Sequence, residues 1–584
     1  MKKKLSIQLI GFLSVVMLLG TLSCQKTFDI EPKSAIVSDQ MYRNVYDADA
    51  AVFGIYGKFL NLLDRYVILN ELRSDLADVT PNSDKYLIQL STHSVTEDNP
   101  YADPRPYYEV ILNCNDALKN FDIMRAERKM NEDQYKERYS DLGALRSWLY
   151  LQLGIQYGSI PYITEPFENI NDLNDESKYP KISFDVLLDN LIQYMESLPS
   201  NMPYSVGSTL RTTVDTYNTE KIFINKNCLL GDLYLWKGDW TSAATAYRDV
   251  LRIGEVPQTV NEEQYYEVYK LSYRAEINGG NWINIFRNTF GERYSNYEIM
   301  WNIPYDKNFN PKNPFIDLFS IFGKYVMKPS DLAINNWNAQ YRNDNGALPG
   351  TPGDRRGLNF SYRMYGTMAE INKYTYNYSP MLPFETTGKI ILYRTANLFL
   401  RFSEAANHDG RDKLALAFVN NGVPNVWQGS NSDKTLLMQS INPFTGLLDT
   451  PPYDFDGRMG DIPRYRSRWY RNIGVRNRIN DMNIVLDSAK YFNLTVTPRV
   501  LTNATLLKKD VEDYIIAESG LETAFEGNRW GDLLRIALRR QATEPNYLSN
   551  KIGAKFDASH SGDAAAVRAR LSDKANWYLP FRWK

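Results

Sequence analysis

Residues 225–251 read NKNCLLGDLYLWKGDWTSAATAYRDVL, and this stretch decides the expected fold. Its apolar residues Leu229, Leu233 and Trp236 recur at i, i+4 and i+7, which is the spacing of one helix face. The dipeptide Gly238-Asp239 then interrupts the pattern, because glycine ends a helix readily and an aspartate side chain can cap the next helix. The stretch therefore predicts two helices joined by a tight turn.

The two predicted helices can approach each other closely, because small residues occur in both of them: Gly231, Ala243 and Ala244. Together with the large residues between them, they resemble a tetratricopeptide repeat. Weaker copies of the pattern cover residues 142–158, 394–419 and 511–538. Hydrophobic residues make up 43% of the sequence, which is enough for a core. We therefore expect a mainly α fold, an α-α superhelix of tetratricopeptide-like helical hairpins.

The predicted hairpins are far apart in the sequence, so the chain must leave the helical layer and return to it. The segments between them are rich in Pro, Gly, Asn and aromatic residues, and loops of such length are usually functional. We interpret them as a loop-rich binding lobe with short strands, such as Glu298–Ile303. Residues 24–584 then form a single domain, with the scaffold in residues 40–253, 390–422 and 505–545, and the lobe in residues 254–389 and 423–504.

Charge and composition exclude several classes of protein. Lys and Arg number 67 against 69 Asp and Glu, a formal net charge of −2, so no nucleic acid is expected as a partner. Three His and three Cys leave little room for a histidine-rich metal centre or a disulfide scaffold. We expect no cofactor and no metal. Cys114 and Cys228 are predicted to be buried free thiols, with a disulfide between them as the alternative in an exported protein.

The first residues resemble an export signal. A cationic start, Met1–Lys4, precedes an apolar run from Leu9 to Leu22 that is short for a membrane span but suits a signal peptide. Small residues then precede Cys24, as in a bacterial lipobox, although Thr21 stands where that motif prefers leucine. We expect residues 1–23 to be a lipoprotein signal peptide and Cys24 to carry the lipid anchor. The alternative is an ordinary cleaved signal that leaves Cys24 as a free thiol.

Six short motifs follow each other in the order found in the SusD/RagB family of outer-membrane nutrient-uptake lipoproteins, which the sequence resembles. Each motif alone is weak, but together they extend over nearly the whole chain. One departure from the family pattern is Asn397, which stands where an acid is usual. The motifs are Phe28–Pro32 (FDIEP), Glu71–Asp75 (ELRSD), Leu145–Tyr150 with Tyr157–Pro161 (LRSWLY and YGSIP), Tyr393–Asn407, Glu522–Asp532 (ETAFEGNRWGD) and Trp577–Pro580 (WYLP).

The resemblance implies four tetratricopeptide-like hairpins and a loop-rich binding lobe. It also implies a protein held on the outer membrane by its lipid anchor, facing the cell surface. There it would lie as a lid on a SusC-like TonB-dependent transporter and capture oligosaccharides, or peptides as in some members. Hydrolysis and transport energy belong to other proteins in that system, so the resemblance implies a binding protein and not an enzyme.

Glycan capture needs flat apolar faces for the C–H groups of a sugar ring and polar side chains for its hydroxyls. The segment 335–341 offers both, because amides such as Asn338 surround Trp337 and Tyr341. We expect these three residues to contact the ligand. Trp282 and Tyr305 are further candidates in the lobe, with packing in the core as the alternative.

A second candidate site lies nearer the N-terminus, where Arg73 and Asp75 precede a loop that contains Tyr101. The resemblance implies that this end of the helical layer borders the ligand surface. The alternative is a structural salt bridge between Arg73 and Asp75.

Two other function classes stay open, a secreted glycoside hydrolase and a tetratricopeptide adaptor that binds only protein. A hydrolase would need two carboxylates about 5–9.5 Å apart. We interpret Glu522, Glu526 and Arg529 as a structural ion-pair network instead. The segment Asp454–Gly457 with Asp461 could ligate calcium through its oxygens, and an ordinary acidic turn is the alternative.

Overall fold

The computed structural model describes residues 41–166, 177–215, 217–252, 271, 281–287, 298–344, 350–426, 438–458, 467, 469–470, 472–496 and 500–582. The predicted signal peptide, Cys24, the motif Phe28–Pro32 and Asp461 lie outside the described residues. Across the described part of the chain, every helix is too short or too polar to cross a membrane.

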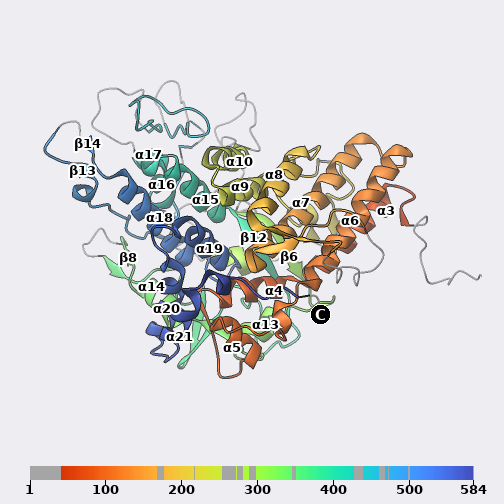
Figure 1. Cartoon of the computed structure of the whole chain (residues 1–584), viewed down its shortest axis with the longest axis horizontal. Coiled ribbons are helices and arrows are strands. Elements are labelled where there is room, and N and C mark those ends of the chain that lie inside the picture. The colour runs from red at the N-terminus through yellow and green to blue at the C-terminus, as the bar shows by residue number, and fades with distance from the viewer. Residues whose placement is uncertain are drawn as a thin grey trace, which may run out of the picture.

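Most of the long helices stand side by side in one layer (Figure 1). Neighbours pack in the order α3, α6, α7, α8, α9, α10, α15 and α16, with α18 against both α15 and α16. The prediction of a mainly α chain built from helical hairpins is confirmed. The bounds are α3 Val45–Leu60, α6 Arg105–Ala126, α7 Glu132–Tyr157, α8 Phe184–Ser197, α9 Lys226–Lys237, α10 Trp240–Arg252, α15 Thr395–His408, α16 Asp412–Val419 and α18 Ala504–Glu522.

The hairpin α9–α10 forms as the sequence predicts. Gly238 ends α9 with a φ of 86°, a conformation that favours glycine. The Asp239 carboxylate accepts the backbone N–H of Ser242 at 3.2 Å and so caps α10. A Cβ atom on Gly231 would lie 2.4 Å from the ring of Tyr247, so this position has room only for glycine. Close packing of the two helices therefore depends on the small residue.

The chain leaves the helical layer after α10 and returns with α15, which packs on α10. Its return path is strand β12 (Gly388–Arg394), which runs directly into α15 and pairs antiparallel with β6 (Ile299–Tyr305). All residues of β12 are buried. The predicted strand at Glu298–Ile303 is thus confirmed, and it lies in the core between the helical layer and the rest of the lobe.

The remaining strands are short and form two-stranded antiparallel pairs. These are β1 (Ala77–Val79) with β7 (Met327–Pro329), β2 (Ser159–Pro161) with β3 (Lys181–Ser183), β4 (Thr213–Val214) with β5 (Tyr217–Asn218), β8 (Tyr341–Arg342) with β9 (Thr351–Pro352), β10 (Tyr362–Tyr365) with β11 (Met368–Ile371), and β13 (Phe492–Asn493) with β14 (Val500–Leu501).

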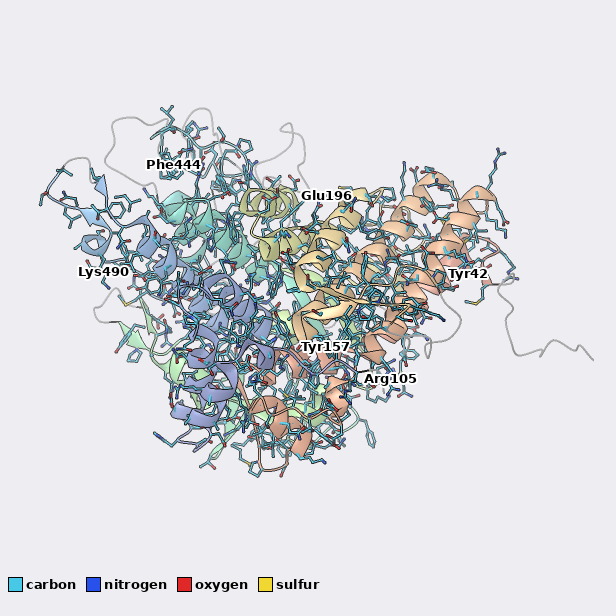
Figure 2. All side chains as sticks on the ribbon, in the orientation of Figure 1. Tyr42, Arg105, Tyr157, Glu196, Phe444 and Lys490 are labelled. Atoms are coloured by element: carbon cyan, nitrogen blue, oxygen red, sulfur yellow. The ribbon has the colours of Figure 1, made fainter. Side chains whose placement is uncertain are left out.

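The other helices cover the lower part of the view in Figure 1 or border the layer. They are α4 Leu63–Val67, the π-helix η2 Ile68–Leu72, α5 Lys85–Ser91, α12 Asn281–Arg287, α13 Phe315–Phe319, α14 Asp331–Asn338, α17 Val423–Val426, α19 Arg529–Arg540, α20 Tyr547–Ala558, α21 Ala564–Leu571 and the 3₁₀ helix η10 Lys574–Trp577. Figure 2 shows the buried Tyr157 near the middle of the molecule and the exposed Phe444 on an outer loop.

Two of the short sequence motifs meet in space although more than 450 residues separate them. The Glu71 carboxylate, on η2, accepts the backbone N–H groups of Gly527 at 2.7 Å and Asn528 at 3.1 Å, just before α19. Asp75 forms two hydrogen bonds with the Arg529 guanidinium, at 2.7 and 2.8 Å. The motifs ELRSD and ETAFEGNRWGD therefore join the two ends of the chain.

Cys114 and Cys228 are both buried and free, as predicted, so the disulfide alternative is wrong. Burial raises the pKa of the Cys114 thiol to about 12, which keeps it protonated and unreactive.

Candidate functional site

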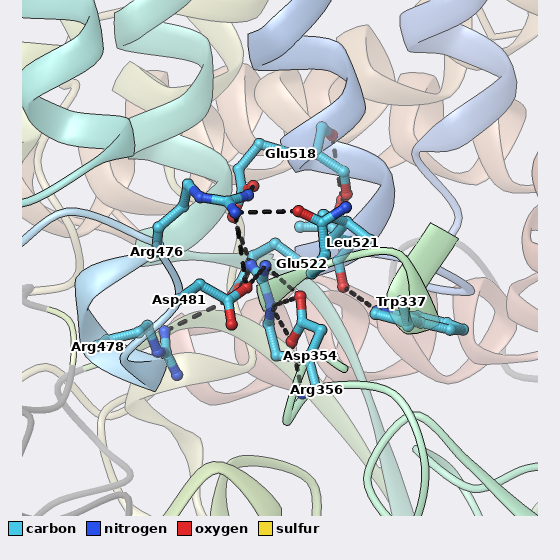
Figure 3. A network of polar contacts seen from close by, with 12 residues as sticks. Trp337, Asp354, Arg356, Arg476, Arg478, Asp481, Glu518, Leu521 and Glu522 are labelled. Atoms are coloured by element: carbon cyan, nitrogen blue, oxygen red, sulfur yellow. Dashed lines mark hydrogen bonds and ion pairs between the residues drawn. The ribbon is translucent and has the colours of Figure 1, made fainter. Parts of the chain in front are cut away.

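The segment that the sequence favours as a ligand site is divided between the core and the surface. Trp337, on α14, is only 1% exposed, and its indole N–H donates to the Leu521 carbonyl at 3.1 Å (Figure 3). Its ring stacks on Tyr362 with the centroids 5.6 Å apart. Trp337 therefore fixes α14 to α18. The expectation that its ring faces a ligand is corrected, because neighbouring elements cover it.

Tyr341, four residues later, is 43% exposed, and Asn338 and Asn343 beside it in the sequence are exposed as well. The backbone of Tyr341 is held on both sides, by the pairing of β8 with β9 and by the Met482 N–H, which donates to the Tyr341 carbonyl at 2.8 Å. An aromatic ring with amides nearby thus stands on a well-anchored backbone. We call Asn338, Tyr341 and Asn343 the Tyr341 face.

Trp282 and Tyr305 are both 1% exposed, so the core alternative applies to them. The ring of Trp282 lies under the positive groups of Arg478, Arg394 and Lys373, with distances of 4.7, 5.0 and 5.4 Å from its centroid. Tyr305 packs edge-on against the ring of Phe315. Neither ring can stack on a ligand at the surface, and the expectation of ligand contact is corrected for both.

The N-terminal candidates are also arranged differently from the expectation. Arg73 does not pair with Asp75, because Asp75 is engaged by Arg529. Both Arg73 and Asp75 are buried. Tyr101 is half-buried beside the guanidinium of Arg65, 5.9 Å from its ring centroid. Arg73, Asp75 and Tyr101 therefore do not form one exposed site. The alternative, a salt bridge between Arg73 and Asp75, is also wrong, because the partner of Asp75 is Arg529.

A large buried cluster of charges joins α18 to segments that lie outside the helical layer (Figure 3). The Arg356 guanidinium lies 2.6 Å from Glu518 and 2.9 Å from Glu522, both on α18. Arg394, at the end of β12, lies 2.7 Å from Glu522 and 2.8 Å from Glu526. We call this set the ionic centre: Glu298, Asp354, Arg356, Lys373, Arg394, Arg476, Arg478, Asp481, Glu518, Glu522 and Glu526. The structural role predicted for Glu522 and Glu526 is confirmed, whereas Arg529 belongs to the separate pair with Asp75.

The ionic centre combines six carboxyl groups with five cationic side chains. Burial and the negative charge of Asp354 raise the pKa of Asp481 well above its usual value, which favours its protonated form. Although burial opposes ionisation, the guanidinium groups of Arg478, Arg394 and Arg356 lower the pKa of Glu522 to about 2. The carboxylates of the ionic centre are therefore held in ion pairs, which does not favour a role in acid–base chemistry.

The carboxylates of the acidic turn Asp454–Gly457 are also engaged in ion pairs with arginines. Asp454 pairs with Arg248, and Asp456 pairs with Arg458 at 2.7 Å. Among the described residues, no group of three or more His, Cys, Asp or Glu side chains is arranged to hold a metal ion.

A cavity of about 40 Å³ lies inside the helical layer, between α7, α9 and α19. Trp148, Trp236, Asp232 and Arg401 are among the residues that line it. A single buried water needs roughly 10–15 Å³. This cavity therefore suits a few water molecules and not a ligand.

A larger cleft, of about 230 Å³, lies between the N-terminal part of the chain and its C-terminal end. Arg73, His93 and Val95 line one side, and Asn576, Tyr578 and Pro580 line the other. We call it the Arg73 cavity. The sequence pointed to Arg73 but not to His93 or to residues 575–580. The motif WYLP was the only signal there, and its position next to Arg73 becomes visible only in the folded chain.

The proteins found to be similar to this chain are SusD-like, in agreement with the family that the sequence motifs resemble. No protein-family model matches the sequence. The chain is 22% identical over 564 residues to SusD-like protein P38 of Formosa agariphila, covering 89% of this chain and 90% of that one. A SusD superfamily protein from Bacteroides vulgatus ATCC 8482 superposes with a TM-score of 0.59 at 15% identity, covering 92% and 96% of the two chains. A laminarin-binding SusD-like protein superposes with a TM-score of 0.51 at 15% identity, with the same coverage.

These matches extend over nearly the full length of both partners, so the shared fold is not confined to the helical layer. The protein is similar in sequence to a SusD-like protein and has the fold of the SusD superfamily structures.

Proposed function

We propose that the protein is a lipid-anchored binding protein of the cell surface that captures oligosaccharides and delivers them to a SusC-like TonB-dependent transporter. The observation that carries the proposal is the SusD fold over nearly the whole chain, which it shares with a SusD-like protein that binds laminarin. A SusD-like carbohydrate-binding protein of Bacteroides fragilis NCTC 9343 has the same fold, with a TM-score of 0.51.

The Tyr341 face supplies the chemistry that a sugar needs. A sugar ring presents C–H groups on its faces and hydroxyl groups at its rim, which suit an aromatic ring and amides respectively. The ring of Tyr341 is 43% exposed, and the amides of Asn338 and Asn343 are exposed in the same segment. We assign glycan contact to this face because its backbone is fixed, which lowers the entropy cost of binding.

The protein acts without catalysis in this proposal. A glycosidase needs one carboxyl group that can hold a proton and a second that is free to attack or to activate water. The carboxylates of Glu518, Glu522 and Glu526 are buried against guanidinium or ammonium groups. Carboxylates held in this way favour a role in the fold.

Delivery to a transporter and anchoring through Cys24 complete the proposal. Labelling of growing cells with a fatty-acid analogue is expected to mark the wild-type protein and not the Cys24→Ser variant. Purification of the tagged protein from detergent-solubilised outer membranes is expected to recover a large TonB-dependent transporter. Recovery of the protein alone, at the same yield of lipidated chain, would contradict delivery to that partner.

Titration calorimetry against a panel of neutral and acidic oligosaccharides and of peptides tests the binding step. We expect binding without product formation for at least one glycan. For that glycan, Tyr341→Ala should weaken the affinity about tenfold, roughly 1.4 kcal/mol, because stacking area is lost. Tyr514→Ala is the matched control, since Tyr514 is a similarly exposed tyrosine on the scaffold helix α18. Product formation would support a hydrolase, and binding of peptides alone would assign a different cargo.

A further inference from the structure

Among the residues that the structure describes, Arg73 is a buried cation without a carboxylate partner. Its guanidinium donates to the Gln156 side-chain oxygen at 2.5 Å and to the Trp577 carbonyl at 2.7 Å, and it lies 4.1 Å from the centroid of the Trp530 ring. The third donor of the group, Nε, has no hydrogen-bond partner. All of these contacts are to neutral groups, so no described side chain compensates the positive charge of Arg73.

Buried arginines elsewhere in the described part of the chain are treated differently. Arg138, Arg356, Arg394, Arg529 and Arg535, for example, each lie within 3 Å of at least one carboxylate oxygen. The exception besides Arg73 is Arg146, which also contacts only neutral acceptors. An uncompensated buried charge is costly, and proteins normally pair such a group. Arg73 differs further in that it lines a cavity large enough for a ligand.

His93, which lines the same cavity, lies near further positive groups. Burial, together with the charges of Arg73, Lys555 and Arg570, lowers the pKa of His93 well below its usual value, so this imidazole is neutral. His93 Nε2 lies 2.8 Å from the Arg73 carbonyl, which only accepts, so Nε2 carries the ring proton and Nδ1 is an acceptor. His93 is therefore a neutral residue of the lining, and its Nδ1 can accept a hydrogen bond.

The other side of the cavity comes from the C-terminal segment. Asn576 is exposed, and its amide nitrogen donates to the Arg570 carbonyl at 2.9 Å. Tyr578, Leu579 and Pro580 add an aromatic ring and apolar surface, and Val95 faces them in the lining. None of the residues that line the cavity is acidic.

We propose that the Arg73 cavity binds an anionic sugar unit, with the carboxylate or sulfate group toward Arg73 and the ring between Val95 and the C-terminal segment. This inference rests on the proposed glycan-binding function and names its substrate class, an acidic oligosaccharide. The charge of the ligand supplies the counter-ion that the described part of the chain does not, while His93 Nδ1 accepts a hydroxyl proton. The Tyr341 face contacts other units of the chain.

The test uses monosaccharides, so that the cavity is probed without the rest of the glycan. We expect glucuronate to bind the full-length protein and to raise its melting temperature, because a ligand that binds only the folded state stabilises it. Glucose at the same ionic strength should do neither. Glucose 6-sulfate and inorganic sulfate distinguish a sulfate ester from a carboxylate and from a simple anion.

Asn576→Asp places a negative charge at the rim of the cavity without touching the core. We expect it to weaken glucuronate binding by about tenfold or more, because like charges repel across a short distance. Asn61→Asp is the matched control, since Asn61 is exposed, donates to a backbone carbonyl and does not line the cavity. It should change the affinity less than about twofold.

Three outcomes would overturn the inference: no binding of any anionic sugar by the wild type, equal binding of glucose and glucuronate, or equal loss in both aspartate variants. In each of these cases, binding of a neutral oligosaccharide that depends on Tyr341 would leave the proposed function intact. Loss of all glycan binding would instead reject the proposed function itself.

Discussion

The ionic centre and the Arg73 cavity are two buried regions built around arginine, and they differ in one respect. In the ionic centre, guanidinium groups such as Arg356 and Arg394 face carboxylates within 3 Å. In the cavity, Arg73 faces a side-chain amide, a backbone carbonyl and an indole ring. Burial is nearly complete in both places, so burial alone does not reveal the role of a charged residue. The presence of a counter-charge is more informative. Where carboxylates of the chain pair with the arginine, the region has a structural role. Where they do not, an anionic ligand can pair with it.

Arg394→Met tests the structural half of this comparison and should have the largest effect. The substitution leaves the buried carboxylates of Glu298, Glu522 and Glu526 with too few cations. Removing one partner of a buried ion pair costs about 3–5 kcal/mol, so we expect at least this loss in the free energy of unfolding. Urea denaturation followed by circular dichroism measures it. A loss below about 1 kcal/mol, as for an exposed pair, would contradict the structural role.

Trp337→Ala tests whether Trp337, which packs beside the ionic centre, contributes to the stability of the core. Trp337 bonds to the carbonyl of Leu521, the residue before Glu522, so its loss opens a cavity beside the charges. We expect a loss of about 3–5 kcal/mol in unfolding free energy. The neighbouring Tyr341→Ala should stay within about 0.5 kcal/mol, because that ring is exposed. Equal unfolding free energies of the two variants would contradict the assignment of Trp337 to the core.

Acid should weaken the ionic centre over a defined range of pH. Pairing with Arg478, Arg394 and Arg356 lowers the pKa of Glu522 from 4.5 to about 2, so the folded state binds fewer protons than the unfolded state between these values. The contribution of Glu522 is therefore complete above pH 4.5 and is lost as the pH falls toward 2, a change of roughly 3 kcal/mol. Glu522→Gln should flatten this part of the stability profile. An unchanged acid profile in that variant would contradict the assignment.

Arg73→Met should destabilise the protein less than the substitutions of the buried Arg394 and Trp337. It removes two hydrogen bonds but also an uncompensated charge, so we expect a loss of about 1–3 kcal/mol, less than for Arg394→Met. Denaturation of both variants under identical conditions makes the comparison. A loss as large as that of Arg394→Met would mean that Arg73 holds the fold as the ionic centre does.

Much of the helical layer was predictable, because the signals are local. The spacing of Leu229, Leu233 and Trp236 and the break at Gly238-Asp239 specify α9 and α10 without reference to the rest of the chain. The same applies to the helix that ends at Tyr157. The lobe gave weaker signals, because its strands are two to seven residues long and pair with distant partners.

The candidate site was predictable only in part. Trp337 and Tyr341 stand in the same amide-rich segment, and their composition does not distinguish them. The structure buries one and exposes the other, because α14 turns Trp337 toward Tyr362 and Leu521. The sequence selected Arg73 as a polar group near an expected ligand surface, and the alternative paired it with Asp75, which the structure pairs with Arg529 instead. The motifs that support the family resemblance turned out to contact each other, so they report on the fold more than on the ligand.

The sequence by itself determined the helical hairpins and the order of the motifs, and with them the SusD-like architecture. Helical periodicity and capping act within a few turns of chain, so they can be read without neighbours. Only the tertiary structure decided which charges are paired and where a cavity lies. Arg73, His93 and Asn576 come together over nearly 500 residues of chain. Burial and counter-charge are properties of all the surrounding elements at once, and no local pattern carries them.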